Sequence, residues 1–218
     1  MSEFFPRLHR AEHPLIGHLL DEARDRHTAP PRFRRILELL GGLLAYEATR
    51  DLEIEPVELA TPMEPMRGRR LRSPVTIVPI LRAGLGLAEG MQDMIPHTAV
   101  GHLGIFRDEQ KLEPVSYYRK LPSRIAGSVV LVVDPMLATG GSAAAALKVL
   151  RDAGCRDLRF ICLVAAPEGL RRVWQQHPEV PIYTAAVDRG LDARGYILPG
   201  LGDAGDRLYG TLDPPESE

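Results

Sequence analysis

The sequence predicts an α/β fold in which an open, mostly parallel sheet is flanked by helices. Short apolar runs at residues 75–78, 128–133 and 158–166 have the length and composition typical of buried parallel strands. A strong helix-forming segment at 142–151 separates the second run from the third, which gives a strand-helix-strand unit with parallel strands. Glycine-rich or polar segments follow the runs, at the sheet edge where open α/β sheets bind ligands.

The length and composition of the chain favour a self-supporting globular protein. With 218 residues, of which 44% are hydrophobic and 26% charged, it can bury a core without disulfides or a structural metal. The net charge of −2 gives no general attraction for nucleic acid or anionic membranes. No apolar run is long enough to span a bilayer and the N-terminus lacks an apolar signal core, so we expect a cytoplasmic protein with Cys155 and Cys162 as buried thiols.

Residues 1–72 are expected to form a helical N-terminal part that ends in a hairpin. Thr28 and Pro30 predict a helix start, and apolar residues then recur at helical spacing. This stripe fits either the core or a subunit contact, and Gly41 and Gly42 inside it indicate close packing against another backbone. The stripe consists of Phe33, Ile36, Leu37, Leu40, Leu43 and Leu44. A basic run predicts a solvated hairpin, with an effector site or interface as the alternative, and its members are Arg67, Arg69, Arg70 and Arg72.

A single domain is expected over residues 1–212. Its α/β core covers 73–187, and a glycine-rich loop region covers 188–212. The acidic, proline-rich residues 213–218 are expected to form a flexible tail.

The segment from Asp134 to Ser142 combines a carboxylate at a strand end with a glycine-rich loop before a helix. Backbone N–H groups at glycines and at a helix N-terminus bind anions, and Thr139 and Ser142 add hydroxyl donors. The carboxylate can accept hydrogen bonds from two ribose hydroxyls, so the segment predicts a site for a ribose 5-phosphate group. The alternative is an ordinary turn in which Ser142 caps the helix. The candidate residues are Asp134, Pro135, Met136, Leu137, Ala138, Thr139, Gly140, Gly141 and Ser142.

Two arginines that follow other predicted strands are candidate phosphate ligands. Arg82 stands in a turn with two nearby glycines, and its guanidinium suits two phosphates at once. A capped turn with a surface arginine is the alternative. Arg107 is the second candidate cation and lies in a polar excursion at 104–109, of the kind that covers ligand sites. The aromatic and basic residues 117–120 fit a solvated strand.

The glycine-rich segment 195–206 is the candidate site for a flat ring. Gly200, Gly202 and Gly205 satisfy the spacing G-x-G-x-x-G. A dinucleotide site also needs a following helix and an acidic residue about 20 positions on, whereas this sequence ends at Glu218, so we do not interpret this match as a dinucleotide site. The glycines expose backbone polar groups that can bind the edge of a heterocycle, with Asp203 beside it. A compact C-terminal loop is the alternative.

Together these segments resemble the uracil phosphoribosyltransferase family over nearly the whole chain. The similarity includes His13-Pro14-Leu15 and Tyr46-Glu47-Ala48-Thr49, and it is closest at 78–86, 134–142 and 196–210. At Asp134-Pro135 a single acid stands where most other phosphoribosyltransferases have two adjacent acids. Residues 59–73 fit the family least well. The resemblance implies a type I phosphoribosyltransferase fold and the conversion of uracil and 5-phospho-α-D-ribose 1-diphosphate to UMP and diphosphate, a step of pyrimidine salvage.

The resemblance also assigns roles to the matching residues. Catalytic roles fall to Asp134, Asp203 and Arg82. The phosphoribosyl diphosphate is expected to contact Arg82, Arg107, the segment from Asp134 to Ser142, and Asp203. Uracil is expected to contact Ile197, Gly202, Asp203 and Ala204. The implied cofactor is Mg²⁺, held through the diphosphate and water with no direct protein ligand. The resemblance permits a GTP effector, and we expect a homo-oligomer.

Two other functions share some of these features. A nucleotide-sensing regulator that binds RNA would keep the fold, but the net charge of −2 and the lack of an aromatic-rich RNA platform disfavour it. Phosphoribosyl transfer to another base is the second alternative. Competition among cytosine, hypoxanthine and uracil would distinguish it from the leading hypothesis.

Overall fold

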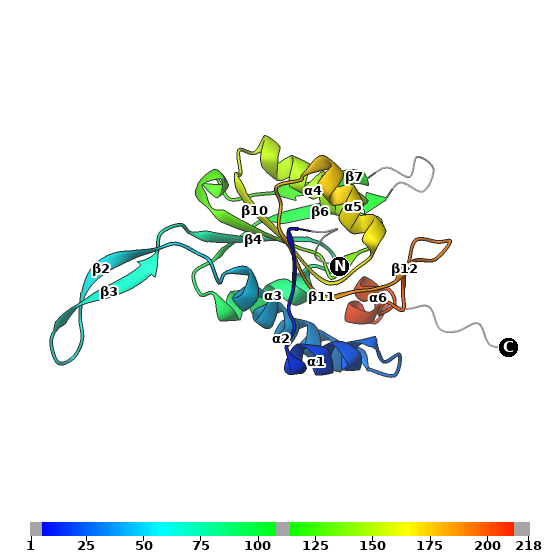
Figure 1. The fold of residues 1–218 in the computed structure, drawn as a ribbon, viewed down its shortest axis with the longest axis horizontal. Coiled ribbons are helices and arrows are strands. Elements are labelled where there is room, and N and C mark those ends of the chain that lie inside the picture. Colours follow the sequence, from blue (N-terminus) through cyan, green and yellow to red (C-terminus); the bar gives the residue numbers. More distant parts are fainter. Residues whose placement is uncertain (1–5, 108–113, 212–218) are drawn as a thin grey trace.

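The structure, a computed structural model, describes residues 6–107 and 114–211 and is built on a mostly parallel sheet (Figure 1). The strand order is β1-β11-β10-β8-β4-β6-β7, and neighbouring strands are parallel except for the antiparallel pair β6-β7. The predicted open α/β sheet is therefore confirmed. The strand bounds are β1 (Leu8–Arg10), β4 (Val75–Leu81), β5 (Ala99–Val100), β6 (His102–Arg107), β7 (Pro114–Lys120), β8 (Val129–Val133), β9 (Met136–Leu137), β10 (Asp157–Ala165) and β11 (Ile182–Val187).

Helices cover both faces of this sheet (Figure 1). One face carries α1 (Pro14–Arg24), α2 (Pro30–Ala48) and α3 (Leu85–Met94), and the other carries α4 (Gly141–Asp152) and α5 (Pro167–Gln176). Strand β8 is apolar throughout because its alternate side chains enter both cores: Val129 and Leu131 pack under α1–α3, and Val130 packs under α4 and α5. Within the described ranges, none of the helices has the length and apolar character needed to cross a membrane.

The apolar stripe of α2 packs into the core. Phe33, Ile36, Leu37, Leu40 and Leu44 are fully buried, so of the two interpretations left open by the sequence the structure supports core packing. The helix begins at Pro30, as predicted. A Cβ atom on Gly41 would lie 2.2 Å from the Leu87 carbonyl oxygen, which confirms the expected close approach to another backbone, that of α3.

Strand β4 continues past the point where the sequence indicated its end. The apolar run was expected to stop at Pro79, but the strand extends to Leu81. Pro79 lies after Thr76 and Ile77, which pair with β5, and before Ile80, which pairs with β6. Pro79 has no N–H group, and such a residue is tolerated at the point where the neighbouring strand changes from β5 to β6.

The predicted hairpin is formed by β2 (Ile54–Ala60) and β3 (Pro65–Leu71), which project away from the rest of the molecule (Figure 1). Two of its four arginines pair with glutamates on the other side of the hairpin. Arg70 and Arg72 form exposed ion pairs with Glu55 and Glu53 at 2.6 and 2.5 Å. These contacts support a solvated hairpin and neutralise much of the basic run.

Both cysteines are buried and unpaired, as expected. Burial raises the pKa of Cys162 to about 12, so this thiol stays protonated at neutral pH. Neither cysteine is part of the site described below.

Candidate active site

The carboxyl end of β8 places Asp134 at the edge of the sheet. The Asp134 N–H donates to the Ile161 carbonyl of β10 at 3.1 Å, which continues the parallel ladder by one residue. The side chain is partly buried and lines a pocket, where its Oδ1 accepts a 3.4 Å hydrogen bond from the Met136 N–H. A buried strand therefore fixes the position of this carboxylate.

The loop after Asp134 leads into α4 through Gly140. This residue has φ +76°, and a Cβ atom there would lie 2.7 Å from the Gly169 carbonyl oxygen, so both the backbone angle and the space require glycine. Gly140 is the N-cap of α4, and no side chain caps the helix. The alternative with Ser142 as the N-cap is therefore wrong. The N–H groups of the first turn of α4 are left available for an anion.

Arg172 of α5 lies beside this loop and was not predicted from the sequence. A Cβ atom on Gly141 would lie 3.4 Å from Nη1 of Arg172. In the described part of the chain Arg172 has no ion-pair partner. It is a positive charge next to the proposed phosphate loop, contributed by a later helix and therefore absent from the local pattern.

The turn between β4 and α3 presents Arg82. A Cβ atom on Gly84 would lie 2.4 Å from the Val133 carbonyl oxygen, so glycine lets this turn pack directly on the end of β8. The half-exposed Arg82 side chain turns toward the C-terminal helix, where its Nη2 lies 3.1 Å from Oδ1 of Asp206. Its guanidinium also lies 5.6 Å from the centre of the Tyr209 ring.

The third predicted segment is only partly described. Arg107 is the last residue of β6, next to β4 in the sheet, and its side chain lies outside the described residues, as do Asp108 and Glu109. Residues 117–120 belong to the exposed strand β7, which agrees with the interpretation as a solvated strand.

The C-terminal segment forms a small hairpin and a short helix. Strands β12 (Gly190–Leu191) and β13 (Ile197–Leu198) pair antiparallel, and α6 (Ala204–Tyr209) follows. A short helix does follow the glycines, and the Asp203 side chain caps α6 by accepting from the Asp206 N–H at 2.9 Å. A dinucleotide site is still disfavoured, since β13 is not part of a strand-helix-strand unit.

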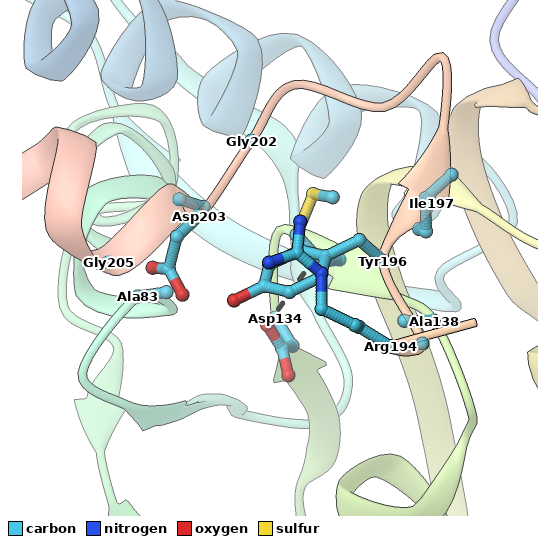
Figure 2. Close-up of a pocket in the computed structure, with 12 residues that line it drawn as sticks. Ala83, Asp134, Ala138, Arg194, Tyr196, Ile197, Gly202, Asp203 and Gly205 are labelled. Carbon is cyan, nitrogen blue, oxygen red and sulfur yellow. Dashed lines mark hydrogen bonds between the residues drawn. The ribbon is translucent and has the colours of Figure 1, made fainter. Parts of the chain in front are cut away.

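A pocket of about 600 Å³ brings these segments together (Figure 2). Of the predicted site residues, the pocket is lined by Asp134, Met136, Ala138, Ile197, Gly202, Asp203 and Ala204. Arg82 and the loop from Thr139 to Ser142 do not line the pocket, although each is adjacent in sequence to a residue that does, Ala83 and Ala138 respectively. Pro135 and Leu137 are buried and do not line the pocket, so their side chains are not available to a ligand there.

Further lining residues were not assigned from the sequence. Arg194 and Tyr196 extend into the space between Asp134 and Asp203 in Figure 2, with the guanidinium 5.7 Å from the ring centre. Their proximity to Ile197 was the signal that could have identified them. The unassigned lining residues are Ala83, Arg194, Gly195, Tyr196 and Gly205.

The environment of Asp134 favours its protonated form. Burial raises the pKa of Asp134 to about 7, the Met136 N–H lowers it, and the nearby charge of Asp203 raises it further. Asp134 therefore changes charge near neutral pH, which is typical of functional sites.

The pocket fits a magnesium ion that arrives with a ligand. In the described ranges no three His, Cys, Asp or Glu side chains cluster closely enough to hold a metal directly. Asp134 and Asp203 nevertheless offer carboxylate oxygens, which Mg²⁺ prefers, often through its water molecules.

Known proteins resemble this chain along nearly its whole length. A family model described as uracil phosphoribosyltransferase matches residues 10–211. Relatives of that name from Acholeplasma laidlawii and Clostridium botulinum are 53% and 52% identical over 91% of this chain and 96% of their own lengths. A solved structure from Aquifex aeolicus has a TM-score of 0.89 and 41% identity, covering 93% of this chain and 97% of that one.

A more distant structure shares the fold alone. Adenine phosphoribosyltransferase from Trypanosoma brucei has a TM-score of 0.57 at 14% identity, with 88% of this chain and 89% of that chain covered. The family model and the relatives cover nearly the whole chain, and the sheet order and the pocket at Asp134 are those expected from the resemblance. The chain therefore belongs to the uracil phosphoribosyltransferase family.

Proposed function

We propose that this protein transfers a 5-phosphoribosyl group from phosphoribosyl diphosphate to N1 of uracil, giving UMP and diphosphate. The observation that carries the proposal is a single pocket, lined by Asp134 on one side and by Gly202, Asp203 and Ala204 on the other. A ribose site and a base site are thereby adjacent, as the bond between C1 of ribose and N1 of the base requires.

The ribose phosphate occupies the Asp134 side. Ionised Asp134 accepts hydrogen bonds from two ribose hydroxyls, and the loop N–H groups together with the first turn of α4 bind the 5-phosphate. Thr139 and Ser142 add hydroxyl donors, and Arg172 adds positive charge from α5.

The base occupies the opposite side. Ile197 supplies a buried apolar surface, and the backbone around Gly202 and Ala204 supplies hydrogen-bonding groups for the uracil edge. Asp203 lies next to this edge, and either its carboxylate or a water molecule takes the proton that uracil loses from N1.

The reaction forms the C1–N1 bond and breaks the bond from C1 to the diphosphate oxygen. Arg82 exchanges its contact with Asp206 for the leaving diphosphate and stabilises its charge, with Arg107 as the second cation. Bound Mg²⁺ supplies further positive charge to that leaving group. The pocket residues hold N1 in line with C1, so no nucleophilic side chain is required.

The test is a UMP assay with the purified full chain. We expect UMP from uracil, phosphoribosyl diphosphate and Mg²⁺, and little product from cytosine or hypoxanthine. Absence of UMP across a range of pH and Mg²⁺ concentrations would contradict the proposal. A strong, sequence-dependent gel shift with RNA would instead favour the regulator.

Several finer features stay predictions. We propose a cytoplasmic homo-oligomer whose residues 1–212 form one catalytic domain. Adding GTP to the UMP assay tests the effector, and light scattering tests the oligomeric state.

A further inference from the structure

An ion pair whose residues do not line the pocket holds the backbone just before the base site. Arg24, the last residue of α1, forms a two-point contact with Asp188, with Nη1–Oδ2 at 2.8 Å and Nη2–Oδ1 at 2.7 Å. The Asp188 side chain is only 6% exposed and that of Arg24 19% exposed. A paired guanidinium and carboxylate with this geometry and burial are rigid and specific.

Both partners also bind the backbone of Gly200. Its N–H donates to Oδ2 of Asp188 at 2.9 Å, and its carbonyl accepts from Nη1 of Arg24 at 2.6 Å. Asp188 itself is anchored to the sheet, because its N–H donates to the Ala165 carbonyl at the end of β10 at 2.9 Å. The sheet and α1 thus fix the peptide groups on either side of Gly200.

A second arginine holds the next residue. Arg207 of α6 is buried, and its Nη1 donates to the Leu201 carbonyl at 2.7 Å. The same guanidinium donates to the carbonyls of Ala23 and Asp25 at the C-terminal end of α1, where the helix dipole favours a cation. It also lies 4.3 Å from the ring centre of Phe33 in α2.

We infer that Arg24, Asp188 and Arg207 are positioning residues for the base. They connect the end of α1 to residues 200 and 201, and the pocket-lining backbone begins at Gly202. A base recognised through backbone groups depends on backbone position, since displacements of about half an ångström disturb a binding site. The inference rests on the proposed function. It states that the affinity for the base depends on contacts between the end of α1 and the backbone of residues 200 and 201.

The kinetic test compares two variants of the pair with a matched control. Arg24→Lys keeps the charge but cannot bind Asp188 at two points and Gly200 at once, and Asp188→Asn removes one charge. The control, Arg32→Lys, alters another two-point pair on α1, that of Arg32 with Glu22 at 2.6 and 2.7 Å, which is exposed. Neither control partner lines the pocket or contacts residues 200–204.

We expect both variants of the pair to raise KM for uracil at least tenfold, equivalent to about 1.4 kcal/mol of binding. KM for phosphoribosyl diphosphate should stay within about twofold, and the control should change neither value. An equal rise in both KM values, or an unchanged KM for uracil in Arg24→Lys, would overturn the inference. If Asp188→Asn does not fold, Arg24→Lys decides alone.

A measurement without substrate separates this inference from the proposed function. Hydrogen exchange of the ligand-free protein should be at least tenfold faster in residues 199–206 of Arg24→Lys than of the wild type, and unchanged in Arg32→Lys. Unchanged exchange in Arg24→Lys overturns the positioning role even if the wild type makes UMP. Faster exchange in Arg24→Lys, together with a wild type that makes no UMP, would support the positioning contact and refute the proposed reaction.

Discussion

The substitution Asp134→Asn should remove the activity while making the protein more stable at neutral and alkaline pH. The folded protein raises the pKa of Asp134 from 3.8 to about 7, so between these values the folded state holds a proton that the unfolded state has lost. The stability of the wild type therefore falls as pH rises through this range. Asparagine has nearly the same shape and does not titrate.

The magnitude follows from the width of that range. Each pH unit costs the folded state about 1.4 kcal/mol, and the range spans roughly three units, which gives an upper limit of about 4 kcal/mol. Because the Asp134 side chain is partly open to the pocket, solvent screening reduces this, and we expect about 2–4 kcal/mol. In a chain of this length that corresponds to a rise in Tm of roughly 5–15 °C at pH 8.

Urea unfolding of both proteins between pH 4.5 and pH 8 is the assay. The difference in unfolding free energy should be about 1 kcal/mol at pH 4.5, where the unfolded carboxyl is already mostly ionised, should grow as the pH rises, and should level off above pH 7. Asp152→Asn replaces an exposed carboxylate that does not line the pocket and serves as the control for the substitution itself. Parallel curves for the wild type and Asp134→Asn would refute the reasoning about the buried carboxylate.

The same substitution, Asp134→Asn, should lower the activity although it raises the stability. Loss of two hydrogen bonds from ribose hydroxyls to a charged acceptor removes about 3–6 kcal/mol, or roughly 10²–10⁴-fold in kcat/KM for phosphoribosyl diphosphate. In the wild type, KM for this substrate should fall as pH rises toward 7, because only ionised Asp134 accepts both bonds. Near-normal turnover of Asp134→Asn would contradict the proposed role of Asp134 in ribose binding.

Three further substitutions test the neighbouring groups. Gly84→Ala should lower the unfolding free energy by about 1–3 kcal/mol in urea titrations, because its Cβ would lie 2.4 Å from a carbonyl oxygen of β8. Arg82→Lys should lower kcat/KM by roughly 10–100-fold without changing Tm, since lysine cannot bind two phosphates at once. Arg172→Ala should raise KM for phosphoribosyl diphosphate about two- to fivefold, less so in high salt, as expected for a partly exposed cation.

The α/β core could be predicted because its strands are buried on both faces. Burial on both sides leaves no polar alternation, and the apolar runs that became β4, β8 and β10 stand out in the sequence. The end of β4 was missed because tolerance of Pro79 depends on which strands lie beside it. Which strands lie beside β4 is decided by the topology of the sheet and cannot be recognised from the residues around Pro79.

The parts of the site that lie next to each other in the chain could also be predicted. Asp134 and the glycine loop form one segment, and so do Ile197 and Gly202 to Ala204. Arg172, Arg24 and Asp188 were not found, because each acts on a segment that is distant in sequence. An arginine on a helix resembles any other surface charge until the fold shows what it contacts.

The charge balance of the pocket explains why such distant residues matter. Two carboxylates, Asp134 and Asp203, line the pocket that we propose binds a substrate with several phosphate charges. Because the pKa of Asp134 is about 7, its protonation would lower the repulsion of that substrate near neutral pH. Arg82 is paired with Asp206, a partner that we propose the diphosphate replaces. In the proposed base site, recognition depends on neutral backbone groups. Such groups must be held in a fixed position, because they have no charge with which to attract the base. The pair of Arg24 and Asp188 gives that support with both charges satisfied outside the pocket.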